Sequence, residues 1–363
     1  MSEENKYLEI NGKKVFFDDL IHMRVSEKWK DAYERDTLQF IQSWLKGKKE
    51  FTIHTSGSTG KPKAIEINRD IMKKSAKMTA RALHLTAGDT ALACINANYI
   101  GGKMMLVRAL TLDMPLTIIS PASNPFTHLK EGVYFDFIAL VPLQLDNLLG
   151  NESSVRTLNK AKSIIVGGAP VGKHLNQELQ IVKVPVYATY GMTETVSHIA
   201  LKKLNEPGKD RYFKVLREVT IGQDHRECLT IQSPVTGGKK IITNDRVKII
   251  NEHEFEWLGR IDNVVNTGGI KVQLEELESK IEALLAGLDR KENFMICVKE
   301  DAKLGQKLIL LLEGDKREED ELEALLKTKL SYHAPREIIS VPEFSRTGTG
   351  KINRLLTMKK YLD

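Results

Sequence analysis

The stretch FIALVPLQLDNLLGNESSVRTLNKAKSIIVGGAP, residues 137–170, shows the pattern that decides the fold. It predicts a strand at Phe137 to Val141, a helix at Pro142 to Leu149, a second strand at Ser163 to Val166 and then a Gly-rich turn. Strands that alternate with helices in this way cross over into a largely parallel sheet. The stretch therefore predicts an α/β fold.

The same alternation extends from residue 50 to about residue 200, and two changes of pattern follow it. Further strands are predicted at Phe51 to Ile53, Thr90 to Ile95, Pro115 to Ile119 and Val184 to Tyr187, and further helices at Arg69 to Leu85 and Gly102 to Leu112. Short alternating runs at about 210–258, such as Cys228 to Gln232 and Arg246 to Ile250, predict a small antiparallel β subdomain. Beyond Asp262 a helix with an apolar face and alternating strands predict a small α+β domain. We expect domains at 51–261 and 262–363, with the boundary at Asp262.

Composition excludes several classes of protein. The chain has 363 residues and is 41% apolar, so it can bury a large core and is neither a fibre, a disordered tail nor a disulfide mini-protein. Its formal net charge of +6 is mild and is not gathered into a basic stripe, so we expect no nucleic-acid partner. A mild positive charge does favour a polyanion such as a nucleotide.

The three cysteines, Cys94, Cys228 and Cys297, are too far apart for a disulfide framework or a CxxC site, so we expect buried thiols. The N-terminus lacks a signal-peptide pattern, and the charge-free stretch Thr90 to Gly102 is too short to cross a bilayer. These features predict a soluble cytoplasmic protein without membrane insertion.

A loop of hydroxyl, glycine and lysine residues follows the first predicted strand. Glycines let the backbone approach an anion closely, hydroxyls donate hydrogen bonds, and lysine supplies charge. The loop fails the Walker A pattern, which would need glycine at 55 and Ser or Thr at 62, where Thr55 and Pro62 stand. A phosphate-binding loop is favoured over a Gly/Ser-rich surface loop. Its candidate residues are Thr55, Ser56, Gly57, Ser58, Thr59, Gly60, Lys61 and Lys63.

Two more Gly-rich segments follow predicted strands. Gly167 to Pro170 follows the strand at Ser163 to Val166, and Tyr190 to Glu194 follows the strand at Val184 to Tyr187. Ligands of open α/β sheets bind outside the carboxyl ends of the strands, so we expect the three loops to converge on one crevice. There Tyr190 could stack on a base and Glu194 could hold a hard cation beside phosphates.

Two later segments add single residues to this site. Asp245, in Thr243-Asn244-Asp245, is predicted to follow an apolar strand, where it is placed to accept hydrogen bonds from ribose hydroxyls, with an ordinary turn residue as the alternative. Gly348 to Lys351 imitates a phosphate loop but lacks a helix-nucleating pattern around it, so a mobile loop that carries one lysine fits better.

Taken in order, these segments resemble the adenylate-forming superfamily of acyl-CoA synthetases, peptide-synthetase adenylation domains and luciferases. The matches are the loop Thr55 to Lys63, Tyr190 to Glu194, Asp245, the stretch Gly259 to Asp262 with Gly269 and Glu276 to Glu278, and Ser345 to Lys351. Within the superfamily, Leu140 to Leu145, Val166 to Pro170 and Tyr190 to His198 are similar to the o-succinylbenzoate-CoA ligases of menaquinone biosynthesis.

The resemblance implies an acid-thiol ligase that uses ATP, Mg²⁺ and CoA and forms an acyl-adenylate. It implies catalytic roles for Lys351, Glu194 and Thr193, with Glu194 as the metal ligand. Besides the phosphate loop, the implied nucleotide-binding residues are Gly168, Ala169, Pro170, Tyr190, Gly191, Met192, Asp245 and Arg260. The implied substrate residues are Tyr99, Gly102, Arg108, Ser197 and His198, with Lys103 as a further candidate. Asp262 is the implied hinge, and Gly268, Gly269 and Lys271 are implied on the CoA side.

Two departures from the family pattern bear on the acyl side. Tyr99 to Gly102 stands where a His-x-x-Gly stretch is usual, and the phosphate loop begins at Thr55, so the first α/β subdomain must be reduced to a remnant in residues 1–50. The expected substrate is o-succinylbenzoate, and the alternatives are another aryl- or acyl-CoA ligase, a stand-alone adenylation enzyme and a non-catalytic nucleotide-binding relative. The expected partners are small molecules, with a homodimer left open.

Overall fold

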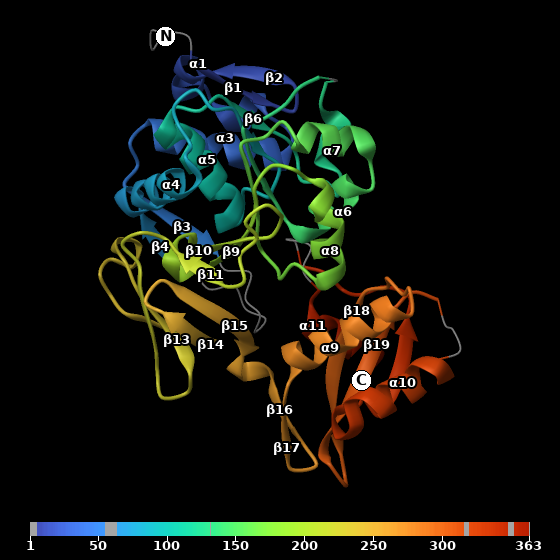
Figure 1. Cartoon of the computed structure of the whole chain (residues 1–363). Coiled ribbons are helices and arrows are strands. Elements are labelled where there is room, and N and C mark those ends of the chain that lie inside the picture. Colours follow the sequence, from blue (N-terminus) through green and yellow to red (C-terminus); the bar gives the residue numbers. More distant parts are fainter. Residues whose placement is uncertain (1–5, 55–63, 131, 316–318, 348–351, 363) are drawn as a thin grey trace. The chain divides into compact units, whose positions relative to one another are not determined.

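The computed structural model describes residues 6–54, 64–130, 132–315, 319–347 and 352–362, and the chain divides into two compact units (Figure 1). The first unit takes in residues 1–171, 178–221 and 231–241. The second takes in residues 172–177, 222–230 and 242–363.

A largely parallel sheet runs through the first unit. Its strands, in spatial order, are β11 (Phe213–Val215), β10 (His198–Lys203), β9 (Val186–Gly191), β8 (Ser163–Val166), β7 (Phe137–Leu140), β5 (Ala91–Ala93), β6 (Leu116–Ile118), β1 (Tyr7–Ile10) and β2 (Lys13–Phe16). Neighbours from β9 to β1 pair in parallel, whereas the pairs β11–β10, β10–β9 and β1–β2 are antiparallel. Every residue of β7 and β8 is buried, as expected for apolar runs in a parallel sheet. The predicted α/β fold is confirmed.

The helices that precede or connect these strands are α1 (Phe17–His22), α2 (Val25–Lys28), α3 (Ala32–Leu45), α4 (Arg69–Leu83), α5 (Ile100–Leu112), α6 (Pro142–Leu149), α7 (Glu152–Leu158) and α8 (Lys173–Glu178). Helix α4 begins where the Asn68 side chain accepts a hydrogen bond from the Asp70 amide, and α5 packs against it. Helix α5 is buried without interruption from Met104 to Ala109, so the charge of Arg108 lies inside the protein. In the part of the chain that the structure describes, no helix has the length and apolar character needed to cross a membrane.

The N-terminal residues contribute to the same sheet. Strand β1 pairs with β6 in the register Leu8↔Leu116, and α3 buries Leu38, Ile41 and Trp44. Residues 6–50 therefore extend the edge of the sheet and supply a helix that packs on the core. Their description as a remnant of a larger subdomain stays a prediction.

The first predicted strand lies outside the parallel sheet. Residues 51–53 belong to β3 (Glu50–His54), which pairs antiparallel with β4 (Ala64–Asn68) in a sheet of its own. The expectation that this run joins the parallel sheet is wrong, because β4 follows it closely enough in sequence to pair as a hairpin partner. Phe51, Ile53 and Ile67 are the buried side chains of this small sheet.

Four antiparallel strands form the β subdomain expected at about 210–258. They are β12 (Thr220–Gln223), β13 (Cys228–Gln232), β14 (Ile241–Asn251) and β15 (Glu254–Arg260), in that spatial order. In the β14–β15 ladder Asp245 lies opposite Arg260. The small antiparallel subdomain is therefore present, with β14 longer than the predicted run Arg246 to Ile250.

The C-terminal part is of the α+β type that the sequence predicts. Its elements are β16 (Val264–Thr267), β17 (Ile270–Gln273), α9 (Leu274–Gly287), β18 (Phe294–Asp301), β19 (Gly305–Glu313), α10 (Asp320–Leu330), β20 (Glu337–Val341) and α11 (Arg354–Tyr361). Leu277 and Ile281 of α9 share a core with Leu310 of β19 and Leu326 of α10. The domain boundary at Asp262 stays a prediction.

The three cysteines are buried free thiols, as expected. Cys94, Cys228 and Cys297 are 0%, 0% and 1% exposed. Burial raises the pKa of Cys94 and of Cys297 to about 12 and also raises the pKa of Cys228. Because the thiolate is the reactive form of cysteine, these thiols are chemically quiet at neutral pH.

Candidate functional site

Two predicted segments lie outside the described residues: the loop Thr55 to Lys63, with all of its candidate residues, and Gly348 to Lys351. The structure does describe the two strands that flank the first of these loops. Strands β3 and β4 pair up to His54↔Ala64, so the residues that flank the loop are cross-strand neighbours. His54 and Ala64, the described residues next to the loop, therefore lie side by side.

Two Gly-rich segments lie at the same edge of the parallel sheet, where β8 and β9 are neighbours in the register Val166↔Ala188. A Cβ atom on Gly167 would overlap the hydroxyl of Thr189, which donates to the Val166 carbonyl at 3.3 Å. Gly168 has a φ of +91°, which L side chains rarely adopt. The glycines of the turn Gly167 to Pro170 are thus required by close strand packing and by backbone conformation.

Strand β9 is longer than the sequence predicts. It runs through Tyr190 and Gly191, which therefore belong to the strand and not to the loop after it. The half-buried Tyr190 ring packs on Phe213 with 5.9 Å between ring centroids. A Cβ atom on Gly191 would overlap the Ser197 carbonyl, because β10 returns closely beside β9. This extra pairing with β10 is what lengthens the strand.

The turn after β9 brings Ser197 back toward the sheet. The Thr195 hydroxyl accepts a hydrogen bond from the Met192 amide at 3.0 Å and donates to the Ser197 carbonyl at 2.8 Å. Val196 has a φ of 65° and a ψ of −44°, and the Ser197 amide donates to the Thr195 carbonyl across it at 2.7 Å. This is a strained γ-turn at a buried β-branched residue, a kind of strain found mainly at functional sites.

Glu194 stands in the same turn, in the short helix Thr193–Thr195, and is exposed. In the part of the chain described, Glu194 has no hydrogen-bond or ion-pair partner, and no three His, Cys, Asp or Glu side chains are grouped to hold a metal. Mg²⁺ is commonly held by one or two carboxylates together with substrate phosphates. An exposed single carboxylate fits that pattern and does not fit an all-protein metal cage.

Arg108 is the most unusual charge in the first unit. It is 2% exposed, and its guanidinium donates to the Ser197 hydroxyl at 2.6 Å and to the Thr79 hydroxyl at 3.3 Å. Its remaining contact is the Met105 sulfur at 3.8 Å, a weak acceptor. Burial lowers the pKa of Arg108 to about 9, so the guanidinium stays charged at neutral pH.

Among the described residues, Arg108 has no carboxylate partner. His198 lies in the same cluster, with its Nε2 atom 3.1 Å from the Thr79 hydroxyl. Burial, with a smaller contribution from Arg108, lowers the pKa of His198 well below its usual value, so this imidazole is neutral. Three predicted substrate residues, Arg108, Ser197 and His198, are thus brought together around Thr79, with an uncompensated positive charge at their centre.

The other predicted substrate residues lie at the start of α5. Tyr99 is the residue that precedes the helix, and Gly102 is buried against the backbone of Asn96 and Ala97. The Lys103 ammonium donates to the Asn98 carbonyl at 3.2 Å, and burial lowers the pKa of Lys103. No contact between described residues joins Lys103 to the cluster of Arg108.

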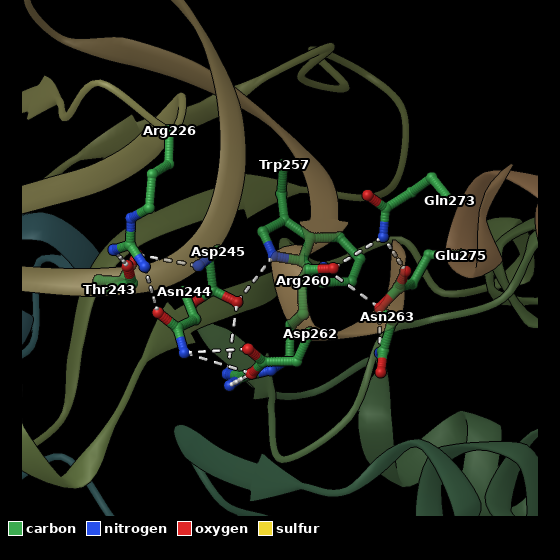
Figure 2. Close-up of polar contacts among 10 residues, drawn as sticks. All are labelled: Arg226, Thr243, Asn244, Asp245, Trp257, Arg260, Asp262, Asn263, Gln273 and Glu275. Atoms are coloured by element: carbon green, nitrogen blue, oxygen red, sulfur yellow. Dashed lines mark hydrogen bonds and ion pairs between the residues drawn. The ribbon is translucent and has the colours of Figure 1, made fainter. Parts of the chain in front are cut away.

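Asp245 lies in the middle of β14 and not after a strand, which corrects the prediction made for it. The correction follows from the length of β14, which pairs with β15 through this position. Figure 2 shows the Asp245 carboxylate between two side chains of β15. The Trp257 indole donates to it at 3.3 Å, and the Arg260 guanidinium lies 3.8 Å away.

Asp262 lies on the other side of Arg260 (Figure 2). Its carboxylate accepts a hydrogen bond from Arg260 at 2.6 Å and from the Asn244 amide nitrogen at 3.1 and 3.3 Å. Arg226 in turn donates to the Asn244 side-chain oxygen at 3.2 Å. The predicted residues Asp245, Arg260 and Asp262 therefore share one polar network.

Four residues of these networks are absent from the sequence-based prediction: Thr79, Arg226, Asn244 and Trp257. Thr79 is a mid-helix residue without a motif, and Arg226 and Trp257 occur in ordinary strand and turn contexts. Only Asn244 carries a local signal, because it directly precedes the predicted Asp245.

The residues predicted on the CoA side form a tight turn. Gly268 and Gly269 join β16 to β17 and have φ values of +58° and +84°, the left-handed pair that a two-residue hairpin turn requires. The Gly268 amide donates to the Leu304 carbonyl at 2.9 Å, and Lys271 is exposed on β17.

Comparison with known proteins shows the family to which this sequence and fold are similar. A model of the family described as AMP-binding enzyme matches residues 26–259. A crystal structure of an acyl-CoA synthetase (AMP-forming)/AMP-acid ligase II-like protein from Dyadobacter fermentans is 40% identical, covers 93% of this chain and 97% of its own, and has a TM-score of 0.61.

Curated relatives carry a more specific name. The 2-succinylbenzoate–CoA ligase of Listeria monocytogenes is 26% identical over 87% of this chain and 71% of its own length. The enzyme of that name from Lactococcus lactis is 23% identical over 98% and 81%. The o-succinylbenzoate CoA synthetase of Bacillus subtilis, solved with ATP and a magnesium ion, is 21% identical over 84% and 69%, with a TM-score of 0.67, and this likeness is one of fold.

Proposed function

Because this chain belongs to the AMP-binding enzyme family, we propose that it is an ATP-dependent acid–CoA ligase that works through an acyl-adenylate intermediate. In the first step a substrate carboxylate attacks the α-phosphate of ATP and pyrophosphate leaves. In the second step the thiol of CoA attacks the acyl carbonyl, and AMP leaves with the electron pair of the broken acyl–phosphate bond. The named relatives support this proposal, and so do the polar network of Asp245 and Arg260 in the second unit and the buried Arg108 in the first.

The described residues divide into a nucleotide side and an acyl side. In the second unit, Asp245 would accept hydrogen bonds from the ribose and Arg260 would add positive charge. In the first unit, Tyr190, braced by Phe213, would stack on the base. Glu194 would hold Mg²⁺ together with the phosphates, and bound there the cation would supply charge neutralisation for the pyrophosphate. We also propose roles for the adenylation lysine, Lys351, and for the loop Thr55 to Lys63, both of which lie outside the described residues.

The observation that carries the substrate class is the buried guanidinium of Arg108. A buried charge without a counter-ion is costly, and since Arg108 has none among the described residues, a carboxylate from the substrate would provide a partner in bidentate form. The reacting carboxylate must lie at the α-phosphate, so the substrate needs a second one for Arg108. o-Succinylbenzoate has one carboxylate on its ring and another on its succinyl chain, and we propose it as the substrate, in line with the names of the curated relatives.

Pyrophosphate exchange across a panel of carboxylic acids tests this assignment. We expect strong exchange with o-succinylbenzoate and weak exchange with benzoylpropionate, which lacks the ring carboxylate. Addition of CoA then distinguishes two of the candidates, because a ligase forms the acyl-CoA thioester and a stand-alone adenylation enzyme does not. Strong exchange with a fatty or amino acid, and none with o-succinylbenzoate, would overturn the choice of substrate, and no exchange with any acid would favour the non-catalytic relative.

An Arg108→Gln variant tests the role of the guanidinium itself. Loss of a charge-assisted contact of about 1.5–3 kcal/mol predicts that KM for the acid rises about 10- to 100-fold while KM for ATP is unchanged. We expect little change in thermal stability, because relief of a buried charge that has no carboxylate partner among the described residues offsets the two hydrogen bonds that are lost. Arg156→Gln, at an exposed arginine of α7, is the matched control. A lower melting temperature with an unchanged KM for the acid would assign Arg108 a structural role instead.

A further inference from the structure

We propose that Asn244, held by Arg226, is a positioning residue of the nucleotide site, because it keeps Asp262 hydrogen-bonded to Arg260 and so keeps the ion pair of Arg260 with Asp245 at 3.8 Å, beyond hydrogen-bond distance. The inference rests on the proposed function, in which Asp245 binds the ribose. The residues that carry it all lie in the second unit, on β14, on β15 and in the turns beside them (Figure 2).

The first step is the orientation of the Asn244 side chain. Arg226 is fixed by the Asp224 carboxylate at 2.8 Å, and it donates to the Asn244 oxygen at 3.2 Å and to the Thr243 carbonyl at 3.1 Å. Because a guanidinium can only donate, the amide oxygen of Asn244 must face Arg226. The amide nitrogen then faces Asp262, where it reaches both carboxylate oxygens.

The second step is a competition between two carboxylates for Arg260. Arg260 lies 2.6 Å from Asp262 and 3.8 Å from Asp245. The Asp245 side chain is 10% exposed and that of Asp262 is 48% exposed, so Coulomb attraction alone favours the more buried partner. An exposed ion pair contributes little by itself. The hydrogen bonds from Asn244 supply the preorganisation that keeps Arg260 on Asp262.

The third step is the consequence for the nucleotide. A carboxylate that binds a ribose diol accepts two hydrogen bonds, and Trp257 is one of the donors to Asp245. If Arg260 closed from its 3.8 Å ion pair to hydrogen-bond distance of Asp245, the ribose hydroxyls would have to compete with a charged donor. Asn244 therefore favours nucleotide binding without a contact to the nucleotide.

Calorimetric titration with ATP and Mg²⁺ measures this effect directly. Loss of one hydrogen-bonded link predicts about 3- to 10-fold weaker ATP binding by Asn244→Ala. Arg226→Gln should weaken binding in the same direction, and it carries the test if Asn244→Ala does not fold. Asn263→Ala is the matched control, because it removes an asparagine–carboxylate hydrogen bond to Glu275 on the other side of the same turn. We expect its ATP affinity to equal that of the wild type.

A double-mutant cycle separates this relay from a general weakening of the turn. In an Arg260→Gln background the Asn244→Ala change should leave ATP affinity unaltered, because the competing guanidinium is gone. Additive effects of the two changes, or wild-type affinity in Asn244→Ala, would overturn the relay. Absence of ATP binding by the wild-type protein would overturn the proposed function and the relay with it, so the two failures are distinguishable.

Discussion

Thr79 determines how Arg108 is presented to a ligand. Its hydroxyl accepts a hydrogen bond from the Nε atom of Arg108 at 3.3 Å, lies 3.1 Å from the Nε2 atom of His198 and donates to the Ser75 carbonyl at 3.2 Å. The contact with Thr79 fixes the guanidinium of Arg108 through its Nε atom. Hydrogens on the Nη atoms are then available to donate to a carboxylate. Thr79 of α4 thus contacts both Arg108 of α5 and His198 of β10, two residues of the predicted acyl side.

A Thr79→Val variant should weaken binding of the acid without affecting ATP. Removal of one hydrogen bond to Arg108 predicts a rise of about 2- to 12-fold in KM for the acid. Thr79→Ser, which keeps the hydroxyl, should restore the wild-type value. Steady-state kinetics with each substrate varied in turn provide the measurement, and an equal rise in KM for ATP would show a general structural defect.

His198 should make stability depend on pH. Burial keeps this imidazole neutral in the folded protein, whereas in the unfolded chain it takes up a proton below about pH 6.5. Its contribution to stability is therefore fully present above that pH and is lost as pH falls further, by up to about 1.4 kcal/mol per pH unit. Urea unfolding at pH 7.5 and pH 5.5 should show a smaller loss in His198→Gln than in the wild type; equal losses would contradict this assignment.

At the scale of residues, sequence reasoning succeeds where a motif is local and fails where contacts are distant. Arg108, Ser197 and His198 were all predicted on the substrate side, and the structure groups them. The pattern predicts Asp245 between two strands, after one apolar run and before Arg246 to Ile250, because it does not show that β14 joins the two runs through Asp245. Thr79 depends on contacts with residues far away in the sequence, so no local pattern identifies it.

At the scale of elements, helix α5 begins at an unusually close backbone contact. A Cβ atom on Gly102 would lie 2.7 Å from the amide nitrogen of Ala97, whereas a Cβ atom on Gly101 would meet nothing within 4 Å. These adjacent glycines therefore form a natural test of whether packing or helix propensity dominates at this position.

We expect opposite effects from alanine at the two positions. Gly102→Ala should lower the free energy of unfolding by about 1–3 kcal/mol through overpacking. Gly101→Ala should be neutral or stabilising by about 0.5–1 kcal/mol, because alanine favours a helix. Chemical denaturation of both variants gives the comparison, and equal effects would show that the contact at Gly102 does not govern packing.

Most elements were predictable because their patterns are short-range. The helices α4, α5 and α6 and the strands β8 and β13 lie within one or two residues of their predicted positions. Where the prediction is wrong, the type of element is correct but its pairing partner is not. Phe51 to Ile53 forms a strand as expected, but it pairs with β4 instead of joining the parallel sheet. Strand pairing is decided by tertiary contacts, which a periodic pattern does not contain.

At the scale of the whole molecule, the residues with roles in the proposed two-step reaction are distributed over both units. The residues around Arg108 belong to the first unit, and Asp245, Asp262 and the hairpin of Gly268 and Gly269 belong to the second. The sequence predicted an α/β part followed by an α+β part, and both are present. The boundary at Asp262, the hinge and the role of the hairpin stay predictions, because they describe movement and not a pattern of residues.

Lys351→Ala should separate the two half-reactions. Loss of one charge at the α-phosphate predicts that adenylate formation slows by at least about 100-fold. Thioester formation from supplied acyl-adenylate and CoA should stay within a few-fold of the wild type, because that step does not use this lysine. Rapid-quench assays of each step make the comparison, and an equal loss of both would contradict the assignment of Lys351 to adenylate formation alone.

The burial of all three cysteines makes movement about the predicted hinge at Asp262 directly measurable. Cys94, Cys228 and Cys297 are enclosed, with thiol pKa values raised by burial, so they should react slowly with maleimide dyes. One cysteine introduced on the surface of each unit could then be labelled with the native cysteines left in place. Single-molecule energy transfer between the two dyes would follow the units through the catalytic cycle in an otherwise unaltered protein.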